Sequence, residues 1–231
     1  MPASPPMPPD GSFASDNSAG VSSEVIEALA AANHGPALGY GDDPWTRRAE
    51  ALLRDRFDAP LTTLACWGGT GANVVGLSTV LQPWEAVICA DCAHVVTDEA
   101  GALSRFAGVS VLPVPHDEGR IAPDAVAPYL QWLGSEHHPQ PRVVSITQAT
   151  ELGALYTADQ IGAVCEAAHA AGLLVHVDGA RIANAVAATG ADLPAMVRDT
   201  GVDLMTFGLT KDGAMYGETV VFLRPELAER A

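Results

Sequence analysis

The stretch TADQIGAVCEAAHAAGLLVHVDGAR, residues 157–181, decides how this chain folds. Thr157 and Gln160 have the spacing of a capping box, and Gly172 is the type of residue that follows the last turn of a helix. The next residues, LLVHVD (173–178), are almost all apolar, as expected for a strand that is buried on both faces. A helix followed at once by such a strand is the repeating unit of an α/β domain.

The same alternation runs along the rest of the chain. We predict helices at 22–33, 43–57, 71–81, 95–106, 122–133 and 157–172, and strands at 61–66, 86–90, 109–114, 140–147, 173–178, 202–207 and 219–223. Ser22 opens the first helix, and Asp43 with Pro44 opens the second. This order predicts an α/β fold with three layers, α/β/α, around a mostly parallel, mixed sheet. We place one large domain at 12–224, after a proline-rich arm at 1–11 that is expected to be disordered.

Composition narrows the functional classes. The chain has 231 residues and a formal net charge of -16, so its surface repels nucleic-acid phosphates and gives no reason to expect docking on anionic lipid. No apolar run approaches the roughly 20 residues that span a bilayer, and the first residues lack the positive charge and apolar core of a signal peptide. We therefore expect a cytoplasmic protein that binds neither nucleic acid nor membrane.

The four cysteines favour a reducing compartment. Cys89 and Cys92 form a C-x-x-C pair, but a zinc site needs a second pair or histidines at ligand spacing, and only His94 is close. A redox pair stands at the start of a helix, whereas AVICADCAH (86–94) has the pattern of a strand that runs into a loop. We interpret the cysteines as buried thiols and predict no metal site.

Three polar, glycine-rich segments follow predicted strands, namely WGGTGAN (67–73), HVDGAR (176–181) and FGLTKDG (207–213). Ligands of open α/β sheets bind at the carboxyl ends of the strands, so these segments are the expected site. In the first segment, Thr70 and the backbone amides at a helix start suit a phosphate. Its glycine spacing matches neither a dinucleotide fingerprint nor a P-loop, so a plain turn is the alternative.

The other two segments place charged residues at the ends of buried strands. Asp178 either caps the following helix or pairs with a cationic ring nitrogen, because an unpaired carboxylate is costly there. Arg181 is suited to bind a phenolate or a carboxylate. Lys211 is the only lysine in the chain. It stands between two apolar runs, where desolvation makes an amine nucleophilic, and an exposed loop lysine is the alternative.

Together these parts match the needs of pyridoxal 5′-phosphate. The cofactor requires a lysine for its aldehyde, an acid for its pyridine nitrogen and a site for its phosphate. Lys211 would supply the lysine, Asp178 the acid and the segment around Thr70 the phosphate site. His94, just after the strand at 86–90, suits stacking on the ring, with a helix-capping or core histidine as the alternative.

Seven long segments extend these motifs over nearly the whole chain. They are SFASDNSAG (12–20), YGDDPWTRRAEALLRDRF (40–57), GGTGANVVGL (68–77), AVICADCAHVVTDEAGA (86–102), SITQATELGALYT (145–157), HVDGARIANA (176–185) and FGLTKDGAMYGETVVF (207–222). Taken together, the segments resemble the low-specificity L-threonine aldolases, which are fold-type-I pyridoxal phosphate enzymes. The resemblance implies the large domain of that fold.

The resemblance also implies cofactor contacts. Lys211 would bind the cofactor aldehyde, and Asp178 would face the pyridine nitrogen. Thr70 and Gly71 would bind the phosphate, and His94 would stack on the ring.

Further positions are implied to serve the substrate and the assembly. Arg181 would contact the cofactor O3′ and the substrate, and Ser15 would touch the substrate carboxylate. Members of the family form a homodimer or homotetramer with the site at a subunit interface, to which Tyr40 would belong.

Two features depart from the family pattern. Leu209 and Asp212 replace the second glycine and the asparagine of the motif FGGTKNG around the lysine. Family members also continue into a small domain that supplies an arginine for the substrate carboxylate. We therefore expect residues 225–231, with Pro225 in a first helical turn, to be the start of a truncated C-terminal region, either in a truncated gene model or in a partial chain.

The implied activity is the cleavage of L-threonine, L-allo-threonine and related β-hydroxy-α-amino acids to glycine and an aldehyde. His94 is our expected general base, with Glu99 as the alternative. Other pyridoxal phosphate reactions, such as β-elimination, transamination or racemisation, stay open because the same parts serve them. A truncated relative that binds cofactor without activity is a third reading.

Overall fold

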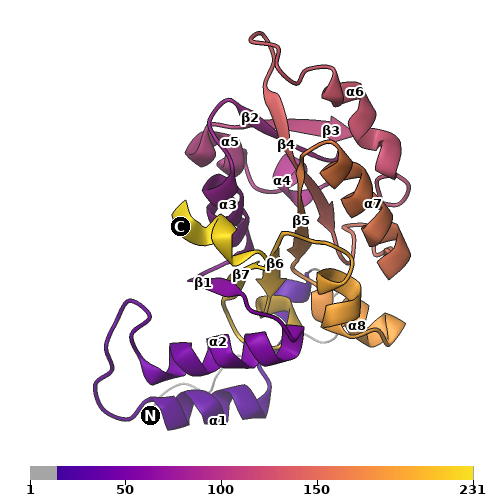
Figure 1. The fold of residues 1–231 in the computed structure, drawn as a ribbon. Helices are drawn as coiled ribbons and strands as arrows, with labels where there is room; N and C mark the ends of the chain where they lie inside the picture. The colour runs from indigo at the N-terminus through magenta and orange to yellow at the C-terminus, as the bar shows by residue number, and fades with distance from the viewer. Residues whose placement is uncertain (1–14, 231) are drawn as a thin grey trace.

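The computed structural model describes residues 15–230, which form one sheet with helices on both faces (Figure 1). The predicted disordered arm at 1–11 lies outside the described residues. The strands are β1 (Thr62–Cys66), β2 (Glu85–Ala90), β3 (Ser110–Val114), β4 (Gln140–Thr147), β5 (Leu174–Gly179), β6 (Leu204–Gly208) and β7 (Glu218–Phe222). They lie in the order β1-β7-β6-β5-β4-β2-β3.

The sheet is mostly parallel, as predicted. β2 pairs in parallel with β3 and β4, β4 with β5, and β5 with β6. β7 runs antiparallel to both of its neighbours, β6 and β1. All six residues of the central strand β5 are buried, which explains why its sequence is apolar without alternation.

The two helical layers meet opposite sides of β5. Leu174 belongs to a buried cluster with Leu77 of α3 (Gly69–Val80) and Leu103 of α5 (Ala102–Ala107). Val175 belongs to a second cluster with Ile161 of α7 (Ala158–Ala170), which also reaches α8 (Ile182–Thr189). Neighbouring residues of a strand face opposite sides of the sheet, so these two clusters are the two faces of a three-layer domain.

The two N-terminal helices, α1 (Ser23–Ala32) and α2 (Pro44–Phe57), extend away from the sheet (Figure 1). Their predicted starts are confirmed, because Ser22 and Asp43 accept backbone hydrogen bonds as N-caps and Pro44 occupies the first turn. Phe57 anchors α2 through an edge contact with Phe207, at 6.1 Å between ring centroids. In contrast, α1 has no buried residue.

Two predicted helices are wrong in extent. The helix expected after Asp178 was given no bounds, and a π-helix at Pro194–Arg198 was not predicted. The segment 95–106 forms α4 (His94–Thr97) and α5, because Ala100 and Gly101 between them adopt left-handed backbone, with φ of 51° and 70°. The segment 122–133 forms a 3₁₀ helix at Pro123–Val126 and then α6 (Ala127–Leu130), where Pro128 removes a backbone donor. α8 gave no start signal, because its N-cap Arg181 makes no capping bond.

The last described residues, Pro225–Arg230, form a short 3₁₀ helix. Leu227 of this helix packs against the clusters beside α3. The boundary at 224 stays a prediction. Among residues 15–230, no helix combines the length and the apolar character that crossing a bilayer requires.

Candidate active site

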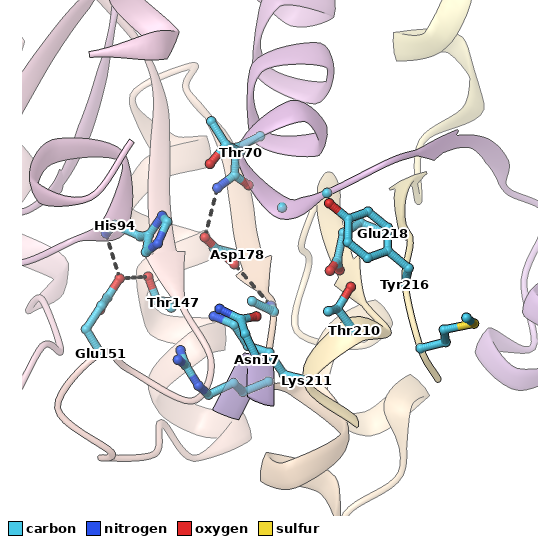
Figure 2. Close-up of a pocket in the computed structure, with 16 residues that line it drawn as sticks. Asn17, Thr70, His94, Thr147, Glu151, Asp178, Thr210, Lys211, Tyr216 and Glu218 are labelled. Atoms are coloured by element: carbon cyan, nitrogen blue, oxygen red, sulfur yellow. Dashed lines mark hydrogen bonds between the residues drawn. The ribbon is translucent and has the colours of Figure 1, made fainter. Parts of the chain in front are cut away.

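A cavity of about 400 Å³ lies where the sequence places the site, at the carboxyl ends of the parallel strands (Figure 2). It is lined by Asn17, Gly68, Gly69, Thr70, Asn73, His94, Thr147, Glu151, Asp178, Ala180, Arg181, Thr210, Lys211, Met215, Tyr216 and Glu218. The structure therefore brings Thr70, His94 and Asp178 together with Arg181 and Lys211. All three glycine-rich segments contribute to this one cavity.

The first segment contributes the N-terminal end of α3. Gly68 is the N-cap in an extended conformation, and the helix begins at Gly69 with no acidic residue in its first turn. The first amides of a helix have no intrahelical partners, so this end of the cavity attracts an anion. Thr70 lines the cavity, whereas Gly71 is not among its lining residues.

Asp178 places a buried carboxylate at the end of β5. The residue is 5% exposed, and its Oδ1 accepts a hydrogen bond from the Ala180 amide at 3.0 Å. Its Oδ2 accepts a second from Nδ2 of Asn73 at 2.9 Å. These donors offset the cost of burying the charge. The alternative role as a helix cap is wrong, because the N-cap of α8 is Arg181.

Lys211 stands in a short 3₁₀ turn, Thr210–Asp212, between β6 and β7. The turn is fixed to β7 because the amide of Leu209, just before it, donates to Oε2 of Glu218 at 3.1 Å. Burial raises the pKa of the Glu218 carboxyl. Lys211 is only partly exposed and lines the cavity, so it is not a solvated loop lysine.

Gly208 lets the lysine turn approach the segment after β5. A Cβ atom on Gly208 would lie 2.6 Å from Cα of Ala180, closer than real Cβ contacts allow. Glycine at the end of β6 therefore permits the packing that places Lys211 and Asp178 on one cavity.

Arg181 forms an ion pair across the cavity margin with Asp16, which sequence reasoning did not identify. Nη2 of Arg181 lies 3.2 Å from Oδ1 of Asp16, and Nε also donates to the same carboxylate. Although burial opposes it, this bond and the positive charge hold the pKa of Asp16 below its ordinary value. Ser15 caps the 3₁₀ turn Asp16–Ser18 and does not line the cavity, whereas Asn17 does.

His94 begins α4 and faces the cavity (Figure 2). Its Nδ1 lies 2.9 Å from Oε1 of Glu99, and this hydrogen bond raises the pKa of His94. The Glu99 side chain is fully buried and does not line the cavity, so Glu99 acts on a ligand indirectly, through residues such as His94.

Glu151 and Thr147 hold the backbone of His94. Oε1 of Glu151 accepts from the His94 amide at 2.9 Å and from Oγ1 of Thr147 at 2.8 Å (Figure 2). Both residues line the cavity and were missed by sequence reasoning. The signal was present, because they belong to the polar stretch TQATE (147–151), which begins with the last residue of a predicted strand.

The C-x-x-C pair does not build a shared site. Burial raises the pKa of the Cys89 thiol to about 12. Cys92 lies instead near Asp91 and His116, with potential ligand atoms within 4.8 Å of one another. Nδ1 of His116 accepts the Gly119 amide at 2.8 Å, which leaves the proton of the neutral ring on Nε2, the atom that faces Asp91 at 3.1 Å. This tautomer disfavours a metal there, and the absence of a metal site stays a prediction.

The strand order, the single antiparallel strand and the cavity formed by a lysine, a carboxylate and a helix start define the large domain of the fold-type-I enzymes. More specifically, the chain belongs to the beta-eliminating lyase family, whose model matches residues 12–231.

Individual proteins similar to this chain in sequence or structure point to the same family. Low-specificity L-threonine aldolases from a Pseudomonas species and from Pseudomonas aeruginosa are each 39% identical over 218 residues, which cover 94% of this chain and 63% of theirs. The solved threonine aldolase of Leishmania major matches with a TM-score of 0.86 and 30% identity, covering 93% of this chain and 62% of that one. The resemblance read from the motifs is confirmed, and the chain spans somewhat less than two thirds of the length of these relatives.

Proposed function

We propose that this chain carries the cofactor site of a pyridoxal phosphate-dependent aldolase. Its reaction is the cleavage of L-threonine, L-allo-threonine and related β-hydroxy-α-amino acids to glycine and an aldehyde. The observation that carries the proposal is the meeting of Lys211, Asp178 and the start of α3 on one cavity. Relatives of 39% identity with the same activity in their names support the choice of reaction.

The residues present fit pyridoxal 5′-phosphate. Gly68–Thr70 offer unpaired amides to its phosphate, and Gly71 is assigned to the same turn. Asp178 presents a fixed, buried carboxylate to the pyridine nitrogen. Lys211 offers the amine for the aldehyde, and His94 offers a ring face. When bound, the cofactor supplies an electron sink for the bond that breaks at the substrate α-carbon.

His94 is assigned the proton transfer from the substrate β-hydroxyl. Its Nδ1 is held by the buried Glu99, which leaves Nε2 to exchange a proton in the cavity. General-base help of this kind is typically worth about 10²–10⁴-fold in rate.

Arg181 is assigned to the cofactor O3′ and to the substrate carboxylate, with Ser15 nearby as a second contact. The guanidinium already binds a carboxylate, that of Asp16, in a forked geometry. A substrate carboxylate would compete with Asp16 for the same donors, so binding of the amino acid would release Asp16.

A homo-oligomer completes the proposal. Leu38 and Tyr40 are highly exposed on the connection between α1 and α2, and Trp67 is exposed beside the cavity, where it packs on Tyr216. Exposed apolar groups of this size suit burial against a second copy. Size-exclusion chromatography with light scattering tests this, and a monomer at all concentrations would contradict it. The four free thiols fit a reducing cytoplasm.

Replacement of the single lysine tests the proposed function directly. Pyridoxal 5′-phosphate titrated into the wild-type protein should give the absorbance band of a cofactor bound through Lys211. Reduction with borohydride should then give a stable covalent adduct at the same residue. Lys211→Ala and the charge-matched Lys211→Arg should both lose the band and the adduct. A Lys211→Ala protein that keeps them would overturn the proposal. A product assay for glycine plus aldehyde, against keto acid plus ammonia, separates the aldolase from other lyases.

A further inference from the structure

A line of buried polar side chains runs from β4 to Asn73 of α3, which lines the cavity. The contact of Asn73 with Asp178 is described above, but the rest of the line has no assigned role. Ser145, His176 and Thr206 lie on three strands, and Asn73 lies on α3, all of them buried. Oγ of Ser145 is 2.9 Å from Nδ1 of His176. Nε2 of His176 is 3.3 Å from Oγ1 of Thr206, which is 2.7 Å from Oδ1 of Asn73. Polar groups are rarely buried as a continuous line without a reason.

The hydrogen bonds along this line all point in one direction. Asn73 must turn its NH₂ group toward Asp178 and Glu99, because carboxylates only accept, so its Oδ1 faces Thr206. The Thr206 hydroxyl therefore donates to Asn73. Burial lowers the pKa of His176 to about 4, which leaves its ring neutral near pH 7. Nε2–H of His176 then donates to Thr206, and Nδ1 accepts the Ser145 proton.

At the end of the line, one amide nitrogen serves two buried carboxylates. Nδ2 of Asn73 donates to Oδ2 of Asp178 at 2.9 Å and to Oε1 of Glu99 at 2.8 Å. The same Oε1 atom is the one that binds Nδ1 of His94. A flip of the amide would present Oδ1 to both anions and leave the Thr206 hydroxyl facing an NH₂ group. The orientation of Asn73 thus decides whether each of the two buried carboxylates keeps a second donor, besides the Ala180 amide on Asp178 and His94 on Glu99.

We propose that Asn73 is a positioning residue, whose amide is held in one orientation by Thr206 and His176. In that orientation it keeps Asp178 aimed at the cofactor nitrogen and Glu99 on His94. The inference rests on the proposed function for the roles of Asp178 and His94, but the hydrogen-bond line itself is independent of it. Asn73 acts through the two carboxylates and takes no proton in the reaction.

Two substitutions at Thr206 separate the hydrogen bond from packing. Thr206→Val keeps the shape but removes the hydroxyl that fixes Asn73, and Thr206→Ser keeps the hydroxyl but loses a methyl group. The loss of one buried hydrogen bond should weaken pyridoxal phosphate binding about tenfold in Thr206→Val. Thr206→Ser should bind within about threefold of the wild type, because its donor remains. Equilibrium titration of cofactor absorbance measures both, and thermal melting confirms that each variant is folded.

A second measurement needs no cofactor. Asn73→Asp places a third carboxyl group beside those of Glu99 and Asp178. The added negative charge should raise the midpoint of the His94 titration by roughly one pH unit in the cofactor-free protein. The histidine NMR signals report it, with His94→Gln for assignment. Asn33→Asp is the matched control, because it makes the same exchange at the exposed end of α1. Its His94 midpoint should equal that of the wild type.

Three results would overturn the inference. One is wild-type cofactor affinity in Thr206→Val, and another is an equal loss in the Val and Ser variants, which would indicate packing alone. The third is an unchanged His94 midpoint in Asn73→Asp. A wild-type protein that binds no cofactor would instead count against the proposed function, and the His94 titration would still decide the role of Asn73.

Discussion

Replacement of Gly208 by alanine should loosen the whole site. The added Cβ atom would lie 2.6 Å from Cα and 2.7 Å from the carbonyl carbon of Ala180, and it would also meet the Ala180 oxygen. These are backbone atoms, so no side-chain rotation can relieve the contact. Ordinary contacts begin at 3.4 Å, so the segment after β5 must retreat by roughly 1 Å.

The expected cost follows from that displacement. Overpacking in a close-packed interior destabilises by about 1–3 kcal/mol even when side chains can adjust, so a backbone clash should reach about 3 kcal/mol. For a domain of this size, that loss lowers the melting temperature by roughly 6–12 °C. Because Ala180 and Arg181 line the cavity, the same retreat should weaken pyridoxal phosphate binding.

Gly162→Ala is the matched control, because the same methyl group enters a different environment. Gly162 lies inside α7, and a Cβ atom there meets nothing within 4 Å. Alanine favours a helix over glycine, so this variant should gain about 0.5–1 kcal/mol. Urea denaturation gives both free energies of unfolding, and cofactor titration gives both affinities. A Gly208→Ala protein as stable as Gly162→Ala, with unchanged cofactor affinity, would refute the reasoning.

Two further predictions concern stability. Thr157→Ala removes the N-cap side chain of α7 and its bond to the Gln160 amide, and should lower the free energy of unfolding by about 1 kcal/mol in urea denaturation, whereas no change would contradict the capping box. Glu99 holds the pKa of His94 above its ordinary value, so this pair stabilises the fold fully below about pH 6.5 and loses that contribution as the pH rises through the raised pKa. Glu99→Gln should remove this loss of stability above about pH 6.5, measured as the free energy of unfolding against pH. An unchanged slope would count against the pair.

Signals that are local in the sequence predicted their part of the structure well. The capping box at Thr157 and the proline start at Pro44 depend on residues within one helical turn, and both are confirmed. The break after α4 was locally visible as Gly101, but the left-handed φ of Ala100 was not, because alanine seldom adopts that conformation. The apolar run 173–178 predicted a strand buried on both faces, because only a central strand can hide every side chain.

Long-range contacts within the site were beyond local patterns. Asn73 stood in a quoted motif, yet its partners Asp178 and Thr206 lie 105 and 133 positions away. The pair of Arg181 with Asp16 spans 165 positions. No periodicity or cap signal records such pairs, because they exist only once the strand order is set. Local patterns therefore identified the ends of β1, β2, β5 and β6 as sites of chemistry, but not the end of β4 or the contacts among these side chains.

The strand order also has a consequence for how the chain is made. Among the described strands, β1 pairs with β7 alone, although these are the first and the last to leave the ribosome. While residues 67–217 are being translated, Thr62–Cys66 lacks its partner strand, so its unpaired backbone groups stay exposed until β7 emerges. A nascent chain stalled just before Glu218 would lack β7, the partner of β1. It would also lack Glu218, which anchors the lysine turn. It would be a substrate for chaperones or proteases rather than a domain with a formed cavity.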